Sequence, residues 1–277
     1  MQNQGGMVVR ILTALTAAIA AAITLPFISS PASASARASH NIIQPGFTMD
    51  KFATADPGAA QYWMDRRNAY ATGQPGPYGA TTSVHVFYNL SSLARMGPRL
   101  PRGSWVLYDI EVWSVTPLAE QQNPEKAMKQ FNAAASGMGL RPIDSPAMDL
   151  DNIDTACPKK THGGDKFTWY IECNIAGAAV SDGGKGVIIQ SQSHVGSAEF
   201  GALVRLARAD AIKVNPAAFI DAQVSVKHGT AAQAIAALTG LGRHLINGIY
   251  MTETNANAAK PGGWEAKILN GLMAKGW

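Results

Sequence analysis

The sequence predicts an α/β fold, a (β/α)₈ TIM-like barrel that is either complete or irregular. Short aliphatic and β-branched runs alternate with segments of helical periodicity, which is the pattern of parallel strands joined by helical crossovers. About 240 residues follow an apolar N-terminal segment, a length typical of this barrel. No G-x-G-x-x-G or G-x-x-x-x-G-K-[ST] loop is present, which argues against an open nucleotide-binding sheet. We therefore expect a single barrel domain over residues 37–277.

Seven segments are typical of barrel strands, because they are rich in aliphatic, aromatic and β-branched residues. The predicted strands are 42–49, 83–89, 104–111, 140–145, 186–192, 217–226 and 245–252. Closure of the barrel needs an eighth strand, for which 165–180 is a candidate. That stretch is more typical of a helix, with alanine and glycine on one side. The sequence alone therefore does not establish whether the ring of strands is complete.

Helical segments follow most of these strands. They are predicted at 57–71, 124–139, 197–214, 230–242 and 261–276. Pro124 is a start signal for the second helix and Gly139 a stop signal, since Pro suits the first helical turn and Gly the position after the last. Thr230 is a suitable N-cap for the fourth helix.

The first 36 residues are predicted to be a secretory signal peptide. An apolar run, ILTALTAAIAAAITL, follows Arg10, and A-x-A cleavage sites come after it at 32–36. The alternative is a retained membrane anchor, because residues 7–28 could nearly span a bilayer. The small residues at the cleavage sites favour removal. We therefore expect a secreted, extracellular protein with no membrane association after cleavage of the signal.

The two cysteines and the net charge bear on the disulfide bond, the metal site and the binding partner that the sequence predicts. In an exported chain, Cys157 and Cys173 favour a disulfide bond, with two buried free thiols as the alternative. A metal site is not expected, because His162 is the one plausible nearby ligand, and no cofactor is predicted. The net charge is +4 without a dense Lys/Arg cluster, so nucleic acid is not an expected partner. A carbohydrate or cell-wall glycan suits an exported, mildly basic protein better.

The segment 104–113, SWVLYDIEVW, starts as an apolar strand and ends on two carboxylates. Alternation places Asp109 and Glu111 on the same face as Leu107, with the two acids about 7 Å apart along the strand. In a parallel barrel the carboxyl ends of the strands converge on one mouth, where active sites lie. Asp109 and Glu111 are therefore the predicted catalytic residues.

Polar and aromatic side chains also end the other predicted strands. Aromatic rings can stack on sugars, and amide side chains can bond hydroxyl groups both as donors and as acceptors. The predicted substrate-binding residues are Asn89, Trp113, Gln190, Gln192, Gln223 and Tyr250. Further residues placed at strand ends are Tyr88, Asp144, Ser145, His194, Ser225 and Thr252.

A partly desolvated carboxyl beside a like charge keeps its proton to a higher pH, while its partner stays ionised. On this ground Glu111 is expected to act as the general acid and Asp109 to stay ionised, a division that suits glycosidic cleavage. Glu253 is a candidate second carboxyl. The alternative is structural, with Asp109 and Glu111 paired to Lys or Arg of a neighbouring loop at the rim.

The D-x-E ending of YDIE resembles the strand-end acid motifs of (β/α)₈ glycosidases, notably family 18 chitinases and family 25 muramidases. The chitinase pattern D-x-x-D-x-D-x-E has further acids where this chain has Ser104 and Leu107, so the resemblance does not imply a substrate-assisted mechanism. Longer stretches, YDIEVWSVTPLAEQQNPEKAMKQF, IIQSQSH and IKVNPAAFIDAQVSV, resemble secreted barrel proteins of actinobacteria. That resemblance implies an exported protein with a barrel fold, and it does not indicate any particular activity.

The sequence thus predicts a secreted, glycoside-hydrolase-like barrel that cleaves a polysaccharide or cell-wall glycan by carboxylate acid/base chemistry. A catalytically inactive barrel that binds glycans or a cell-wall partner is the alternative, since the same polar mouth can recognise sugar without cleaving it. Neither a G-x-S-x-G elbow nor an H-E-x-x-H motif is present, so serine-hydrolase and zinc-protease chemistry are not expected.

Overall fold

Eight parallel strands form a closed barrel in a computed structural model of the chain. The structure describes residues 40–64, 69–73, 82–158, 163–242, 244–252 and 262–277. The predicted signal segment, residues 1–36, and the candidate carboxyl Glu253 lie outside the described residues. The barrel confirms the predicted (β/α)₈ fold and shows that the ring of strands is complete.

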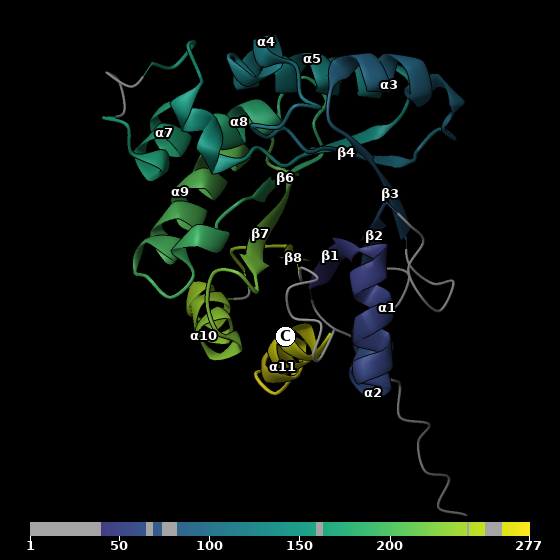
Figure 1. The fold of residues 1–277 in the computed structure, drawn as a ribbon, viewed down its shortest axis with the longest axis vertical. Coiled ribbons are helices and arrows are strands. Elements are labelled where there is room, and N and C mark those ends of the chain that lie inside the picture. The colour runs from purple at the N-terminus through teal and green to yellow at the C-terminus, as the bar shows by residue number, and fades with distance from the viewer. Residues whose placement is uncertain (1–39, 65–68, 74–81, 159–162, 243, 253–261) are drawn as a thin grey trace, which may run out of the picture. The chain divides into compact units, whose positions relative to one another are not determined.

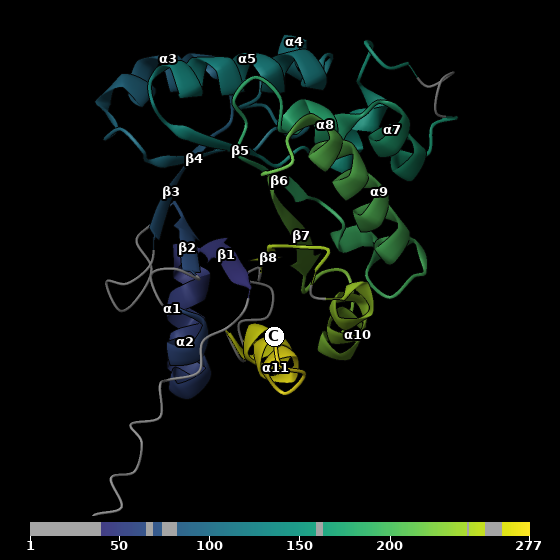
Figure 2. The same cartoon turned by 180° about the vertical axis from the view of Figure 1, so that it is seen from behind.

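Each strand pairs with the next one along the chain, and the last strand pairs with the first (Figures 1 and 2). The strands are β1 (Asn41–Pro45), β2 (Ala69–Thr72), β3 (Thr82–Phe87), β4 (Trp105–Tyr108), β5 (Arg141–Asp144), β6 (Gly186–Ile189), β7 (Phe219–Ser225) and β8 (Gly248–Thr252). All of them run in one direction, so their carboxyl ends meet at one mouth of the barrel.

Helices follow the strands and lie around the outside of the barrel (Figure 1). The α-helices are α1 (Gly46–Ala55), α2 (Pro57–Trp63), α3 (Leu90–Met96), α4 (Leu118–Gln121), α5 (Pro124–Gly137), α7 (Lys166–Glu172), α8 (Ile175–Ala179), α9 (Glu199–Val214), α10 (Ala231–Leu241) and α11 (Gly263–Met273). Short 3₁₀ helices are η2 (Gly97–Arg99), η3 (Met148–Asn152) and η4 (Gln192–His194). Within the described ranges, every helix is too short or too polar to span a lipid bilayer.

Side-chain alternation along the strands divides the apolar residues into two clusters. The inner cluster fills the barrel and consists of Ile43, Val84, Leu107, Ile143 and Ile188, with Tyr70, Val86, Trp105, Phe219 and Tyr250 packed against it. The outer cluster lies between strands and helices, and it includes Val106 and Tyr108, the neighbours of Leu107 on β4. Both faces of most strands are therefore buried, as expected for a parallel barrel, while Ser83 on the outer face of β3 is exposed.

Aromatic rings close the end of the barrel at which the strands begin. Tyr70, Trp105 and Phe219 contact one another with ring centroids 5.8, 6.1 and 6.4 Å apart. The Arg141 guanidinium lies 4.2 Å from the centre of the Trp105 ring. This layer and the aliphatic layer above it separate the polar mouth from solvent at the other end.

The strand that completes the barrel is β2, so the prediction of a helix over 57–71 is wrong at its end. Ala69 and Ala71 are buried against the helices, while Tyr70 enters the barrel. Packing overrides the helical preference of alanine here. Residues 165–180 form α7 and α8 instead of a strand.

The first predicted strand, 42–49, is too long, because residues from Gly46 onward form α1. Met49 and Phe52 are both fully buried in the outer cluster. A spacing of three residues puts them on one side of a helix, whereas it would put them on opposite faces of a strand.

The predicted disulfide bond joins Cys157 to Cys173. It connects the loop that follows η3 to the end of α7. The Asp154 carboxylate supports the same junction, because it accepts hydrogen bonds from the Cys157 amide at 3.1 Å and from Trp169 Nε1 at 3.0 Å. The bond therefore fixes α7 beside the barrel.

Replacing Cys157 and Cys173 together by serine should lower the free energy of unfolding by roughly 3 kcal/mol, because the bond spans 16 residues and restricts the unfolded chain. Denaturant unfolding followed by circular dichroism measures the change. Reductant should shift the midpoint of the unmutated protein by a similar amount and leave the double variant unchanged. Equal midpoints for the two proteins under oxidising conditions would contradict this expectation.

Candidate functional site

Asp109 and Glu111 directly follow β4 at the mouth of the barrel. The Asp109 amide donates to the carbonyl oxygen of the last β3 residue at 2.9 Å, so the chain stays extended beyond the strand. Leu107 belongs to the inner cluster, whereas Tyr108 and Ile110 belong to the outer one. The predicted alternation is therefore confirmed, and both carboxyl groups share the inward face.

The end of β4 is held in place by Tyr108. Its ring stacks on Phe131 of α5, with centroids 4.5 Å apart and the planes 8° from parallel. Its hydroxyl donates to Glu120 Oε2 at 2.6 Å, and the same carboxylate accepts the Leu90 amide at the start of α3. Through these contacts α3, α4 and α5 fix the strand end that carries the two acids.

Two polar side chains link the carboxyl groups to the neighbouring strands. The Gln190 amide donates to Glu111 Oε1 at 3.2 Å and to the Ser145 hydroxyl at 3.3 Å. Ser145 in turn hydrogen-bonds to Asp109. The residues that follow β4, β5 and β6 therefore form one network around the pair.

Burial raises the pKa of both carboxyl groups, to about 8 for Asp109 and to about 7 for Glu111. The charge of Glu111 raises the pKa of Asp109 further, and the charge of Asp149 does the same for Glu111. The hydrogen bonds from Ser145 and Gln190 act in the opposite direction. The expectation that Asp109 stays ionised does not fit this result. Asp109 is the more deeply buried of the two, and its pKa is raised at least as far as that of Glu111.

The structural alternative for the pair was neutralisation by Lys or Arg. In the described part of the chain, no Lys or Arg forms an ion pair with Asp109 or Glu111. Their pKa values rise, whereas a nearby cation would lower them. These observations argue against a rim ion pair.

A cavity of about 270 Å³ opens above the pair. The residues on its wall that were predicted from the sequence are Asp109, Glu111, Trp113, Gln190, Gln192, Gln223, Ser225, Tyr250 and Thr252. The structure therefore brings together the two predicted acids and most of the predicted substrate-binding residues. The side-chain oxygens of Gln192 and Gln223 are buried and have no hydrogen-bond partner within the protein.

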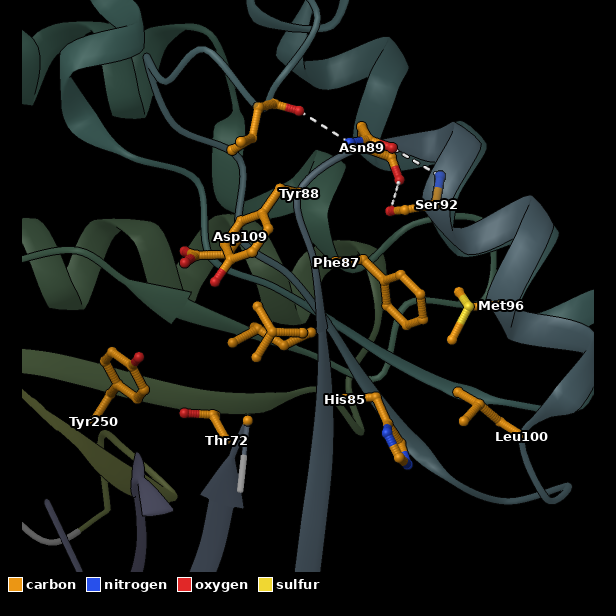
Figure 3. Close-up of a pocket in the computed structure, with 14 residues that line it drawn as sticks. Thr72, His85, Phe87, Tyr88, Asn89, Ser92, Met96, Leu100, Asp109 and Tyr250 are labelled. Atoms are coloured by element: carbon orange, nitrogen blue, oxygen red, sulfur yellow. Dashed lines mark hydrogen bonds between the residues drawn. The ribbon is translucent and has the colours of Figure 1, made fainter. Parts of the chain in front are cut away.

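A larger cavity, of about 710 Å³, begins at Asp109 and Tyr250 and extends past β3 toward α3. In Figure 3, Tyr250 and Thr72 lie on one side of β3, while Met96 and Leu100 lie on the other. Asp109 and Tyr250 also line the smaller cavity. The two spaces therefore meet at Asp109 and Tyr250.

Aromatic rings stand beside the acids. Tyr88 and Trp113 have ring centroids 5.6 Å apart and are 37% and 43% exposed, so parts of both rings are accessible at the mouth. Burial and the charges of Asp109 and Glu111 raise the pKa of Tyr88, and the same influences raise that of Tyr250. Both phenols therefore lie within electrostatic reach of the pair.

Asn89 has a local structural role. Its side-chain oxygen accepts the Ser92 amide at 2.7 Å and caps α3, and its amide donates to the Val115 carbonyl at 2.9 Å (Figure 3). Gln121 donates to the Trp113 carbonyl at 2.9 Å. Asn89 and Gln121 thus hold the loop that carries Trp113. Asn89 also lines the larger cavity.

Two other predicted strand-end residues lie away from the acid pair. Asp144 points toward the helices, where Asn132 donates to its carboxylate at 2.8 Å, so its predicted place in the mouth is wrong. Alternation explains this, because its neighbour Ile143 faces the barrel interior. His194 bonds Glu199 at 3.0 Å and lines neither cavity described above.

Several residues of the mouth were not predicted from the sequence. Thr72 was missed because β2 was taken for a helix. Lys227 follows Gln223 and Ser225 at intervals of two, so the strand alternation could have identified it. Asp149 and Lys166 come from a 3₁₀ helix and from the first turn of an α-helix, where no alternation indicates direction.

Within the described residues, no group of three or more His, Cys, Asp or Glu side chains could hold a metal ion. Comparison with models of known protein families gives no match, and comparison with curated proteins gives no significant match. The barrel and the residues that its mouth brings together are therefore the guide to its function.

Proposed function

We propose that the protein is an exported glycoside hydrolase that cleaves a polysaccharide or cell-wall glycan. The observation that supports this most strongly is the pair Asp109 and Glu111, two carboxyl groups with raised pKa values in an amide- and aromatic-lined barrel mouth. Glycosidic cleavage needs a group that protonates the leaving oxygen and a negative charge that stabilises the cationic sugar. Two adjacent carboxyl groups that hold one proton supply both.

Glu111 is the proton donor in this proposal. It lies two residues further from the barrel core than Asp109, and it also lines a neighbouring cavity that Asp109 does not line. A general acid works best when its pKa is near the working pH, and burial raises that of Glu111 to about 7. The hydrogen bond that the Gln190 amide donates to Glu111 orients the carboxyl group toward the cavity.

Asp109 supports the reaction in those molecules in which the shared proton lies on Glu111, which is the minor one-proton form because Asp109 has the higher pKa. The pKa values of two interacting acids belong to the pair, so one proton is shared between Asp109 and Glu111 over a range of pH. As Glu111 gives its proton to the leaving oxygen, the Asp109 carboxylate faces the developing positive charge on the sugar. A water molecule then adds to the anomeric carbon of that sugar and gives up a proton, which restores Glu111. Ser145 and Gln190 keep both groups oriented during this exchange.

The walls of the mouth suit a sugar chain. Trp113 and Tyr88 offer apolar ring faces for the faces of sugar rings, and Tyr250 adds a hydroxyl beside the acids. The unpartnered oxygens of Gln192 and Gln223 can accept hydrogen bonds from sugar hydroxyls after a small side-chain rotation. Residues around the pair could thus bind and orient substrate.

Glu111→Gln should lower turnover of any glycan that the protein cleaves by roughly a hundredfold or more, because the amide keeps the shape but carries no transferable proton. The assay is reducing-sugar release from a panel of polysaccharides and peptidoglycan, with binding measured in parallel. Glu172→Gln, at an exposed position on α7, is the matched control and should leave turnover unchanged.

Retained turnover in Glu111→Gln would show that Glu111 is not the acid. A native protein that binds a glycan from the panel and releases no reducing sugar is a glycan-binding barrel without hydrolase activity. A native protein that neither binds nor cleaves any member contradicts the proposal as a whole.

The pH dependence of kcat/KM should be a bell with its maximum near neutral or mildly alkaline pH. The pKa values of Glu111 and Asp109 are raised to about 7 and about 8, so the pair holds one proton between these values. Below this range both groups are protonated, and above it both are ionised. Asp109→Asn leaves one titrating acid and should remove the acidic limb. A maximum near pH 5 would contradict the raised values, because it is typical of acids with ordinary pKa values.

A further inference from the structure

The mouth has a basic wall that the proposed chemistry does not use. A cavity of about 390 Å³ adjoins the one above the acid pair, and the two share Glu111, Gln190 and Gln192. Lys227 and His228 also line both spaces, and Lys166 lines the adjoining one. Cationic side chains from two elements therefore surround the space next to the proposed proton donor.

Lys227 is directed to the mouth by the geometry of β7. The strand places Gln223 and Ser225 on its inward side, and Lys227 is the next residue of the same parity. The Val226 amide donates to the Thr252 carbonyl at 3.2 Å, so the pairing with β8 continues past the end of the strand. The Lys227 amide is also held by the Ser225 hydroxyl at 3.3 Å.

Lys166 reaches the same cavity from the first turn of α7. The residue before it, Asp165, caps the helix and accepts the Thr168 amide and hydroxyl at 2.8 and 2.7 Å. The other end of α7 is tied down by the disulfide at Cys173. The position of Lys166 is therefore defined by a cap and a covalent bond.

The charges on this wall are not compensated within the described residues. Neither Lys166 nor Lys227 lies within ion-pair distance of a described carboxylate. Asp149 is the other acidic side chain on the wall besides Glu111. When Glu111 carries its proton, two lysines face one carboxylate, which leaves a net positive cavity.

We propose that Lys227 and Lys166 bind a carboxylate on the substrate, so that the glycan is an acidic polysaccharide built with uronic acid or similar sugars. The inference rests on the proposed function, because the subsite adjoins the proposed cleavage point. An ammonium group suits a carboxylate as a charge-assisted donor. A bound carboxylate would also favour the protonated form of the neighbouring Glu111, as a like charge does. Asp149 would repel the anion and direct it to the lysine side.

The test compares acidic oligosaccharides with the same molecules after methyl esterification, which removes the charge and keeps the sugar. The probes are oligogalacturonide, alginate and hyaluronan fragments, with neutral cello- and chito-oligosaccharides in parallel, and the Glu111→Gln protein prevents cleavage. Binding is measured by calorimetry at low salt. At least one acidic probe should bind about fivefold more tightly than its ester, a difference typical of one exposed ion pair.

Lys227→Ala should weaken this preference and leave the affinity for the ester unchanged, and Lys227→Arg should retain it. Removing both lysines should abolish the preference and so lower affinity for the acid by about fivefold. Lys213→Ala, an exposed change outside the cavities described here, controls for net charge and should have no effect.

Equal binding of acids and esters, or binding of neutral probes alone, would overturn the anionic subsite and leave the proposed hydrolase standing. A preference for the acid that survives removal of both lysines would also overturn the assignment. Absence of binding to every acidic and neutral probe would count against both the subsite and the proposed function.

Discussion

The arrangement of the barrel mouth is governed by the free-energy cost of holding two carboxyl groups, Asp109 and Glu111, side by side and partly away from water. Two partly desolvated carboxyl groups cannot both ionise cheaply, and no described Lys or Arg pairs with either of them. The surroundings stabilise the arrangement with neutral groups, namely the Gln190 amide and the Ser145 hydroxyl. Tyr108 holds the strand end by stacking on Phe131 and bonding Glu120, so the pair cannot easily separate.

Buried polar residues without a charged partner also lie inside the barrel, below the mouth. Asp221 of β7 is fully buried inside the barrel, neither of its carboxylate oxygens has a hydrogen-bond partner in the protein, and burial raises its pKa. A side chain on Gly248 would lie 2.5 Å from the Asp221 carboxylate, so glycine is required there. Asp221, Gln223, Ser225 and Lys227 thus form a column of polar residues along one strand. Such a column stabilises less than an apolar one, and a role in binding or catalysis would explain it.

Alternation along the strands was the most reliable guide in the sequence. It identified the face that Asp109 and Glu111 share, and applied further it excludes Asp144 from the mouth and includes Lys227. It did not identify β2, because Ala69 and Ala71 favour a helix until packing against the outer helices is known. Side chains from turns, such as Asp149 and Lys166, needed the three-dimensional structure. The pKa of Asp109 also depended on depth, which sequence spacing does not give.

We infer that Asp109 and Glu111 titrate as a buried pair near neutral pH. Carbon-13 NMR of the Asp and Glu side-chain carboxyl carbons measures this directly, with Asp109→Asn and Glu111→Gln proteins used to assign the two signals. Both signals should titrate well above the ordinary range for carboxylic acids, near pH 7 to 8, and removing Glu111 should lower the midpoint of Asp109. Midpoints near pH 4 for both groups, each unaffected by removal of the other, would contradict it.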